Sequence, residues 1–249
     1  MGTTGRPLAL VTGAGRRIGI GAAIARKLAE TGWDIAFTYW PGYDERMPWG
    51  RDDETPAELT AAIEGHGGRA IAVEADLTDP SAASRVFGEA GDVRGLVLSH
   101  AESVDSGILD TTVESFDRHF AVNARASWLL IREFARQFTG PHGTGRIVAL
   151  TSDHTTGNLP YGASKGALDR IVIAAATELR GQGITANVVN PGPVDTGWIS
   201  PALAAELVAR TPLGRLGRPE DTASLVAFLC SPAGAWINGQ LLYSNGGFH

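Results

Sequence analysis

The chain has 249 residues, of which 43% are hydrophobic and 19% are charged, and its formal net charge at pH 7 is −6. This acidic balance argues against a nucleic-acid or anionic-membrane surface, which would need a basic stripe, so we expect small-molecule partners. The single cysteine, Cys230, excludes an internal disulfide, and no cysteine or histidine cluster has metal-ligand spacing, so we expect no metal site.

We expect one domain over residues 1–249, because this length suffices for one large core with little left for a second. Residues 1–7 carry one arginine and no long apolar stretch. We therefore expect neither a signal peptide nor a membrane anchor, and a cytoplasmic location.

Short apolar runs bounded by Gly, Asp or Pro alternate with longer amphipathic stretches, which is typical of repeated strand–helix units. The runs predict strands at residues 9–12, 34–39, 70–74, 95–99, 146–151, 185–191 and 240–244. The longer stretches predict helices at residues 22–31, 56–65, 82–90, 113–138, 161–182, 201–210 and 219–229. Continuous apolar runs such as 8–11 and 147–150 indicate strands buried on both faces, so the pattern predicts an α/β fold with a doubly wound parallel sheet.

The first predicted strand leads into the sequence TGAGRRIGIG at residues 12–21 and then into an alanine-rich helix. Glycines in a strand-to-helix turn let the backbone approach a pyrophosphate, and a helix N-terminus favours its negative charge. Glycine also serves ordinary tight turns, so the position between strand and helix carries the argument. The segment predicts a dinucleotide site that includes Gly13, Gly19, Ile20 and Gly21.

The residues after the second predicted strand favour NADPH over NADH. Proteins specific for NAD place an acid there to hold the ribose hydroxyls, whereas this chain has Thr38, Tyr39 and Trp40. Arg16 and Arg17 in the glycine-rich segment are suited to grip a 2′-phosphate with paired hydrogen bonds. NAD is not excluded, because acids in the following loop could fold back to the ribose, namely Asp44, Glu45, Asp52 and Asp53.

Tyr161 and Lys165 lie four positions apart in YGASK, which places a phenol and an ammonium on one helix face. A neighbouring cation stabilises phenolate, so it would move the phenol pKa from its usual value near 10 toward neutral pH. Tyr161 is then a candidate general acid or base. The spacing alone is common on exposed helices, so other parts of the chain must support this role.

Further motifs follow in chain order: Asp76 and Leu77 after the third predicted strand, Asn123 in AVNA, Ser152 closing the fifth, NPGPVDT at 190–196 and SNGG at 244–247. Together with the glycine-rich segment and the Tyr161–Lys165 pair, this ordered set resembles the short-chain dehydrogenase/reductases over essentially the whole chain. The similarity is strongest to bacterial 3-oxoacyl-(acyl-carrier-protein) reductase-like members. It implies a single Rossmann-like domain with a dinucleotide-binding half at about 1–110 and a catalytic and substrate half at about 111–249.

The resemblance implies that Tyr161 donates a proton to a carbonyl oxygen while the nicotinamide delivers hydride, and that Ser152 orients this oxygen. Lys165 would lower the phenol pKa and bind the nicotinamide ribose. Asn123 would hold a water that links Lys165 to solvent. Structural roles are the alternatives: Asn123 as a polar helix residue facing solvent and Ser152 as a turn residue.

The resemblance also implies contacts along the rest of the nucleotide. Asp76 would accept a hydrogen bond from the adenine amino group beside the Leu77 backbone, although it could instead cap the segment that follows. The remaining implied contacts are Tyr39, Ser99, Ala101, Pro191, Gly192, Val194 and Thr196.

Two departures from the family pattern concern the nucleotide side. The glycine-rich loop is two residues longer than usual, so its arginines could point differently. After the fourth predicted strand, Ser99, His100, Ala101 and Glu102 stand where the family has Asn-Asn-Ala-Gly. A sheet-bracing amide and a glycine are both replaced, and His100 and Glu102 could form an ion pair or titrate near neutral pH, although exposure is the expected state of Glu102.

A third departure concerns catalysis, because only nine positions separate Ser152 from Tyr161, fewer than the family usually leaves. The trimmed loop must still bring Ser152 to the substrate, failing which Thr151 or Thr155 would have to replace it. The trimmed loop would form a shorter wall of the substrate pocket, which favours a more open site and a bulky or carrier-bound substrate. His154 in this loop is a candidate substrate contact.

Residues 197–216 correspond to the family's substrate lid, and Trp198 is the candidate contact there for an apolar acceptor. The leading hypothesis is an NADPH-dependent reductase of a ketone, such as a 3-oxoacyl thioester. The alternatives are an NAD-dependent alcohol or sugar dehydrogenase and a non-catalytic NADP(H)-binding sensor. The resemblance further implies a homotetramer, with an apolar interface from Trp128, Leu129 and Ile131.

Overall fold

The computed structural model describes residues 5–248, in which seven parallel strands form one sheet in the order β3-β2-β1-β4-β5-β6-β7. The strands are β1 (Leu8–Thr12), β2 (Asp34–Tyr39), β3 (Ala70–Glu74), β4 (Val93–Leu98), β5 (Arg146–Leu150), β6 (Thr185–Asn190) and β7 (Leu241–Tyr243). The strand order reverses between β1 and β4, which is where open α/β sheets bind ligands beyond the carboxyl ends of their strands. The predicted fold class and the seven parallel strands are confirmed.

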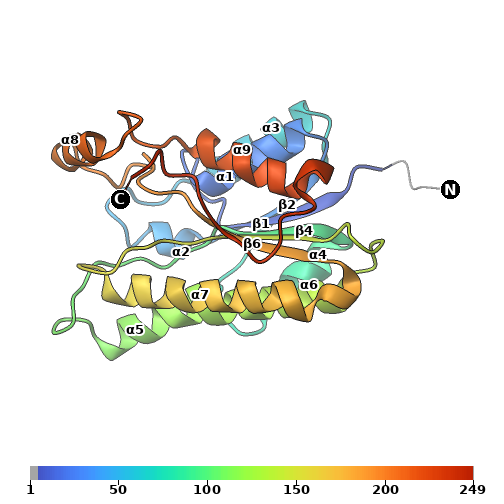
Figure 1. The fold of residues 1–249 in the computed structure, drawn as a ribbon, viewed down its shortest axis with the longest axis horizontal. Helices are drawn as coiled ribbons and strands as arrows, with labels where there is room; N and C mark the ends of the chain where they lie inside the picture. Colours follow the sequence, from blue (N-terminus) through green and yellow to red (C-terminus); the bar gives the residue numbers. More distant parts are fainter. Residues whose placement is uncertain (1–4, 249) are drawn as a thin grey trace.

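Helices cover both faces of the sheet (Figure 1). One face carries α1 (Ile20–Glu30), α3 (Thr55–Gly65) and α9 (Pro219–Cys230), and the other carries α4 (Ala82–Ala90), α5 (Val113–His119), α6 (Ser127–Gln137) and α7 (Leu159–Glu178). The helix α8 (Pro201–Arg210) stands away from both layers, beyond the strand ends, and none of residues 201–210 is buried. This position suits a lid more than a core helix.

Each face of the sheet has its own apolar core, because successive side chains of a strand point to opposite faces. In β1 every residue is buried. Leu10 packs on the side of α4 and α6 with Phe134, whereas Val11 packs on the side of α1 with Ile24. The continuous apolar runs in the sequence thus reflect burial on both faces.

Two helical features differ from the sequence prediction. The predicted helix over 113–138 is interrupted by a π-helical turn, η1 (Phe120–Ala126), between α5 and α6. The segment after β2 contains a short helix that was not predicted, α2 (Pro41–Asp44), which starts with a proline at its first position and is too short to show a helical period. Short 3₁₀ turns, η2 (Arg180–Gln182) and η3 (Pro232–Gly234), follow α7 and α9. No helix within residues 5–248 is both long and apolar enough to cross a membrane.

Candidate active site

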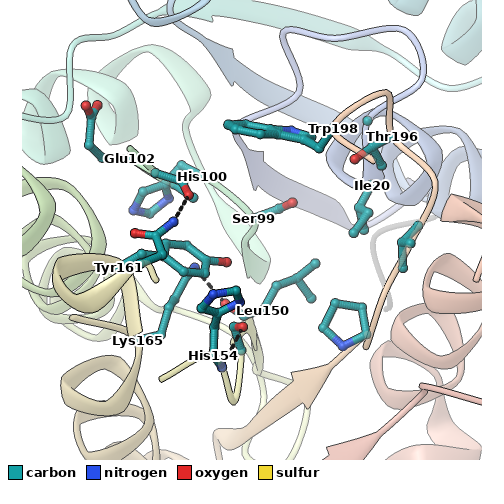
Figure 2. A pocket seen from close by; sticks show the side chains of 18 of the residues that line it. Ile20, Ser99, His100, Glu102, Leu150, His154, Tyr161, Lys165, Thr196 and Trp198 are labelled. Carbon is teal, nitrogen blue, oxygen red and sulfur yellow. Dashed lines mark hydrogen bonds between the residues drawn. The ribbon is translucent and has the colours of Figure 1, made fainter. Parts of the chain in front are cut away.

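The loops at the carboxyl edge of the sheet enclose a cavity of about 950 Å³. It extends from the glycine-rich turn after β1 to Tyr161 on α7 and to the segment that precedes α8. Figure 2 shows Tyr161, Lys165 and His154 on one side of the cavity and Thr196 and Trp198 on the other. This volume is at the upper end of the range of about 300–1,000 Å³ typical of ligand pockets.

Most of the residues predicted from the sequence line this one cavity. The predicted cofactor and catalytic residues on its wall are Gly13, Arg16, Gly19, Ile20, Gly21, Tyr39, Asp76, Leu77, Ser99, Ala101, Ser152, Tyr161, Lys165, Pro191, Gly192, Val194 and Thr196. The predicted substrate contacts, His154 and Trp198, lie there as well. Arg17 and Asn123 are the two predicted residues outside the lining.

In the glycine-rich turn, backbone segments approach one another so closely that a side chain would not fit between them. A Cβ at Gly13 would lie 2.5 Å from the His100 Cα, and one at Gly21 would lie 2.4 Å from the Gly13 carbonyl oxygen. Helix α1 begins after Gly19, which supplies no side-chain cap, so the first-turn N–H groups remain available to a ligand. The helix dipole favours an anion there, so the turn fits the pyrophosphate of a dinucleotide.

The two arginines of this turn diverge. Arg16 lines the cavity, and its guanidinium lies 4.1 Å from the ring centroid of Trp49. Arg17 is exposed and forms ion pairs with Glu58 at 3.0 Å and Glu54 at 4.0 Å, at the start of α3. Arg17 therefore lies outside the cavity lining with its side chain directed to α3, and its predicted cofactor contact has no support from this arrangement.

Residues 41–54, here called the cap segment, form a wall of the cavity that the sequence did not predict. Tyr43, Asp44 and Arg46 of this segment line the cavity. Asp44 is buried and accepts a hydrogen bond of 2.8 Å from Trp49 Nε1. A Cβ at Gly15 would lie 3.6 Å from Asp44 Oδ2, so this carboxylate has folded back to the glycine-rich turn, as one alternative anticipated. Burial raises the pKa of Asp44, while Trp49 and Arg16 oppose this shift.

The sequence held a signal for the cap segment in its aromatic residues. Trp40 directly precedes the cap segment, and Tyr43 and Trp49 lie within it among mostly polar and charged residues. A loop of this kind normally runs exposed over the surface, so three large rings within ten positions indicate that it packs against something. Which residues it contacts could not be read from the sequence, because they come from distant loops.

Tyr161 and Lys165 lie together at the base of the cavity, on the first turns of α7. The Lys165 Nζ lies 5.7 Å from the Tyr161 ring centroid and donates a hydrogen bond of 2.9 Å to the Leu150 carbonyl at the end of β5. Burial lowers the pKa of Lys165 to about 8, against the opposing charge of Asp169. Burial raises the pKa of Tyr161 to about 12, although interaction with the Ser152 hydroxyl opposes the shift.

This pKa differs in direction from the expectation that Lys165 lowers the pKa of the phenol. The reason is that the phenol is taken out of water, which disfavours phenolate, while Lys165 directs its ammonium to a backbone carbonyl. In the protein without a ligand Tyr161 therefore carries its proton at neutral pH. That is the state required of a proton donor.

The trimmed loop between β5 and α7 keeps Ser152 within reach of Tyr161. Its hydroxyl accepts a hydrogen bond of 3.1 Å from the backbone N–H of His154, which fixes the start of the loop. The loop then lies directly on α7, because a Cβ at Gly162 would come within 2.0 Å of the His154 carbonyl oxygen. Ser152 thus interacts with both the loop and the Tyr161 phenol, and its contact with a substrate oxygen stays a prediction.

Asn123 lies behind the cavity on the π-helical turn, where π-turns commonly mark functional sites. Its side chain accepts from the Glu102 N–H at 2.8 Å and donates to the Glu102 carbonyl at 2.9 Å and to Ser164 Oγ at 2.8 Å. Ser164 Oγ in turn donates to the Tyr161 carbonyl. Asn123 is fully buried rather than turned to solvent, and it ties the loop after β4 to the turn that carries Tyr161.

His100 performs the bracing that the missing amide would have supplied. Its Nδ1 lies 2.6 Å from Thr12 Oγ1 and its Nε2 lies 3.0 Å from the Val122 carbonyl oxygen, so the ring bridges β1 and the π-helical turn. Burial is the main cause that lowers the pKa of His100, to about 3, and the nearby charge of Lys165 adds to the shift. His100 is therefore neutral, and the expectation that it titrates near neutral pH is wrong.

Glu102 is buried, which corrects the expectation that it is exposed or paired with His100. Its side chain is 4% exposed and accepts two hydrogen bonds from Arg46, at 3.0 Å and 2.8 Å. The partner comes from the cap segment, whose fold the sequence did not predict. The pair joins the cap segment to the loop after β4, next to the Tyr43 hydroxyl, which donates to the Ser103 carbonyl at 3.3 Å.

Asp76 caps the turn that follows it, which is the structural alternative that the sequence left open. Its Oδ1 accepts hydrogen bonds of 2.8 Å from the N–H and the hydroxyl of Thr78, which caps the following turn. Its side chain also lines the cavity beside the buried Leu77. The capped carboxylate is thereby held on the cavity wall, and its contact with an adenine stays a prediction.

Comparison with known proteins identifies the family. Residues 13–249 match the family model described as enoyl-(acyl carrier protein) reductase. The uncharacterized oxidoreductase YjdA of Bacillus subtilis is 38% identical over 250 residues, covering 97% of this chain and 96% of that protein. The chain is a short-chain dehydrogenase/reductase. It is thus an oxidoreductase, as the ordered motifs predicted.

Other relatives of this short-chain dehydrogenase/reductase carry names that specify a cofactor. The chloroplastic NADPH-dependent aldehyde reductase 2 of Arabidopsis thaliana is 39% identical, over 96% of this chain and 93% of that protein. The crystal structure of the landomycin C-6 ketoreductase LanV with bound NADP and rabelomycin has a TM-score of 0.84 and 32% identity, over 99% of this chain and 97% of that one.

Two further features of this short-chain dehydrogenase/reductase bear on predicted partners. Within residues 5–248 no group of three or more His, Cys, Asp or Glu side chains could hold a metal ion. On α6, Leu129 and Ile131 are 7% and 5% exposed and pack in the core, so of the three predicted interface residues only Trp128 is well exposed. Trp128 and Ile131 instead border a groove of about 470 Å³ with Ile171 of α7.

Proposed function

We propose that this enzyme reduces ketones with NADPH and that Tyr161 is the proton donor. The observation that carries the proposal is one continuous cavity with an uncapped helix N-terminus at one end and Tyr161 beside Ser152 and Lys165 at the other. Burial raises the pKa of Tyr161, which favours the phenol form that a proton donor needs. Bound NADPH would supply the hydride to the carbonyl carbon.

Side chains of the protein itself would supply the proton that the substrate oxygen receives. The Ser152 hydroxyl would bond to the carbonyl oxygen of the substrate and orient it toward Tyr161. Tyr161 would release its proton to this oxygen, and the ammonium of Lys165 would stabilise the phenolate that remains. Asn123 uses both of its side-chain N–H groups to fix this turn, so a water linking Lys165 to solvent would have to donate to Asn123. The free lone pairs are on Oδ1 and on the backbone carbonyl, each of which accepts one bond already.

Arg16 is the residue that supports a preference for NADPH. Its guanidinium lines the cavity near the glycine-rich turn, whereas Arg17 is held by Glu58. A guanidinium offers the planar pair of donors that matches a phosphate. NADP in the complex of the related ketoreductase and the NADPH dependence in the name of the related aldehyde reductase support the same choice.

The far end of the cavity supports a bulky apolar ketone as the acceptor. Trp198, Ile199, Leu203 and Leu207 line it from the segment before α8 and from α8 itself. A polycyclic ketone fits such a wall, and the rabelomycin in the complex of the related ketoreductase is named as a ligand of that enzyme. A 3-oxoacyl thioester is the competing acceptor.

One observation favours a second candidate function, NAD-dependent oxidation of a secondary alcohol. Asp44 lies beside Gly15, where a carboxylate is suited to accept from ribose hydroxyls and would repel a 2′-phosphate. Its hydrogen bond from Trp49 and its attraction to Arg16 weaken that repulsion. Arg16 and Asp44 therefore favour opposite nucleotides.

Titration with NADPH and NADH, followed by nicotinamide fluorescence, separates the two candidates. NADPH binding at least tenfold tighter than NADH, reduced by Arg16→Gln, supports the reductase, whereas tighter NADH binding that is lost in Asp44→Asn supports the dehydrogenase. Turnover is then measured with a small ketone, a polycyclic ketone and a 3-oxoacyl thioester. Tyr161→Phe is expected to lower kcat by about 10²- to 10⁴-fold with NADPH binding retained. Tight binding without turnover on any acceptor would favour the non-catalytic sensor.

We further propose that the groove bordered by Trp128 and Ile171 receives a second copy of the chain in a homotetramer. An exposed tryptophan beside aliphatic side chains is the composition of interface cores. The measurement is the solution mass by light scattering, with Trp128→Glu expected to lower it.

A further inference from the structure

Trp49 of the cap segment is not part of the cavity lining. It contacts three residues that line the cavity, Arg16, Asp44 and Trp198. Its ring lies 4.1 Å from the guanidinium of Arg16, and its Nε1 donates to Asp44 at 2.8 Å. Its ring centroid is 4.4 Å from that of Trp198, with the planes at 66°, an edge-to-face arrangement. The glycine-rich turn, the cap segment and the substrate lid therefore meet at one indole.

The lid backbone approaches the same arginine from another direction. Gly197 has φ +83°, which a side chain rarely adopts, and a Cβ there would lie 3.2 Å from Arg16 Nη2. Arg16 thus has the indole of Trp49 and the backbone of the lid as neighbours. Burial lowers the pKa of Arg16, and the Asp44 carboxylate is the largest influence against that shift.

We propose that Trp49 is a positioning residue that fixes Arg16 for the 2′-phosphate of NADP and, through Trp198, joins nucleotide recognition to the substrate lid. This inference rests on the proposed preference for NADPH. It assigns to the cap segment a role in nucleotide selection through a residue that would not touch the nucleotide.

The chemistry of the three contacts explains how one indole does this. A guanidinium stacked on an aromatic face keeps its in-plane N–H groups free to bind a phosphate, and the partly buried position strengthens the attraction. The Nε1 donation ties up Asp44 Oδ1, which weakens the repulsion between this carboxylate and a 2′-phosphate. The contact with Trp198 and the close approach of Gly197 place the lid next to the arginine that we assign to the 2′-phosphate.

The test compares dissociation constants for NADPH and NADH by nicotinamide fluorescence in three variants. Trp49→Ala is expected to weaken NADPH binding about tenfold and to leave NADH binding within about twofold, because NADH has no 2′-phosphate. Trp49→Phe keeps a ring under Arg16 and against Trp198, so it should stay within about threefold of the parent for NADPH. Trp236→Ala removes a tryptophan that is 98% exposed and serves as the matched control, with no change expected.

A double-mutant cycle tests the link to the lid. Trp198→Ala alone is expected to weaken NADPH binding about threefold, and the variant with both alanines should bind no more weakly than Trp49→Ala, because both losses act through the placement of Arg16. If the double variant loses NADPH affinity by the product of the two single losses, the link between the lid and nucleotide recognition is overturned.

The remaining outcomes separate this inference from the proposed function. Equal weakening of NADPH and NADH in Trp49→Ala, or no weakening of either, would reduce Trp49 to a structural residue and overturn the proposal. If Arg16→Gln lowers the NADPH preference and Trp49→Ala does not, the positioning role alone fails. If Arg16→Gln leaves the preference unchanged, the assignment of the 2′-phosphate to Arg16 fails, and this inference falls with it.

Discussion

Two walls of the same cavity are held in opposite ways. The catalytic loop, residues 152–160, uses several backbone contacts: the His154 N–H donates to Ser152 Oγ, the Leu159 N–H donates to the Ser106 carbonyl, and the loop rests on the bare Cα of Gly162. The buried side chain of Asn158 adds hydrogen bonds to Ser103 and Asp105. The cap segment is held by side chains, through the Arg46–Glu102 pair and the contacts of Trp49.

The difference determines what each wall tolerates. A wall fixed by backbone contact is insensitive to most side-chain changes and very sensitive to added volume at the contact. A wall fixed by a few long-range pairs depends on each partner, because losing one leaves the other buried and unpaired. Variants at matched positions in the two walls test this distinction.

The largest effect is expected at the backbone-held wall, from Gly162→Ala. The added Cβ would meet the His154 carbonyl oxygen at 2.0 Å, so the catalytic loop must move and Ser152 with it. A shift of about 1 Å in an orienting group costs on the order of 100-fold in rate, so kcat should fall by about that factor while NADPH affinity is retained. Gly166→Ala on the same helix meets nothing within 4 Å and is the control. Equal kcat in the two variants would show that the contact does not place Ser152.

The next effect is expected at the side-chain-held wall, from Arg46→Met. The variant leaves the Glu102 carboxylate without its partner in a largely buried position, and we expect a loss of about 2 kcal/mol in the free energy of unfolding. Arg46 is itself partly exposed, which keeps the loss below that of a fully buried pair. Arg51→Met breaks pairs in which both partners are exposed and should leave the free energy of unfolding nearly unchanged. Urea unfolding measures both, and equal losses would contradict the importance of the Arg46–Glu102 pair.

The same contrast explains which parts of the site were predictable from the sequence. Tyr161, Ser152 and the glycine-rich turn follow directly after strands or open helices, so strand order alone brings them to one edge of the sheet. The strand boundaries were also readable, because buried parallel strands are continuous apolar runs.

The cap segment was not predictable in the same way. Arg46 meets Glu102 across 56 positions of the chain, and nothing local in the sequence specifies that pairing. Glu102 therefore looked like an exposed residue, and Arg17 looked like a cofactor contact although α3 supplies its partners. The direction of the Tyr161 pKa was missed for a related reason, since burial depends on the whole fold.

A smaller effect is expected from His100, which bridges Thr12 at the end of β1 and Val122 of the π-helical turn. Its folded-state pKa of about 3 lies below the unfolded value of 6.5, so the unfolded chain takes up a proton first as the pH falls. Stability should be lost from about pH 6.5 downward, by about 1.4 kcal/mol for each pH unit. His100→Asn, which keeps an amide there without a titrating ring, should lose less over this interval. Urea unfolding between about pH 7 and pH 5 tests this, and parallel curves for the two proteins would contradict it.

The smallest effect is expected in the pH dependence of reduction. The Lys165 pKa of about 8 means that the ammonium needed to stabilise the Tyr161 phenolate is lost as the pH rises through that value. The ratio kcat/KM for NADPH, which reports the free enzyme, should fall about fivefold between pH 8 and pH 9. Asp169 raises the Lys165 pKa, so Asp169→Asn should move the fall to lower pH. A fall that stays in place or moves upward in this variant would mean that another group controls the rate, because removing a carboxylate can only make the ammonium easier to deprotonate.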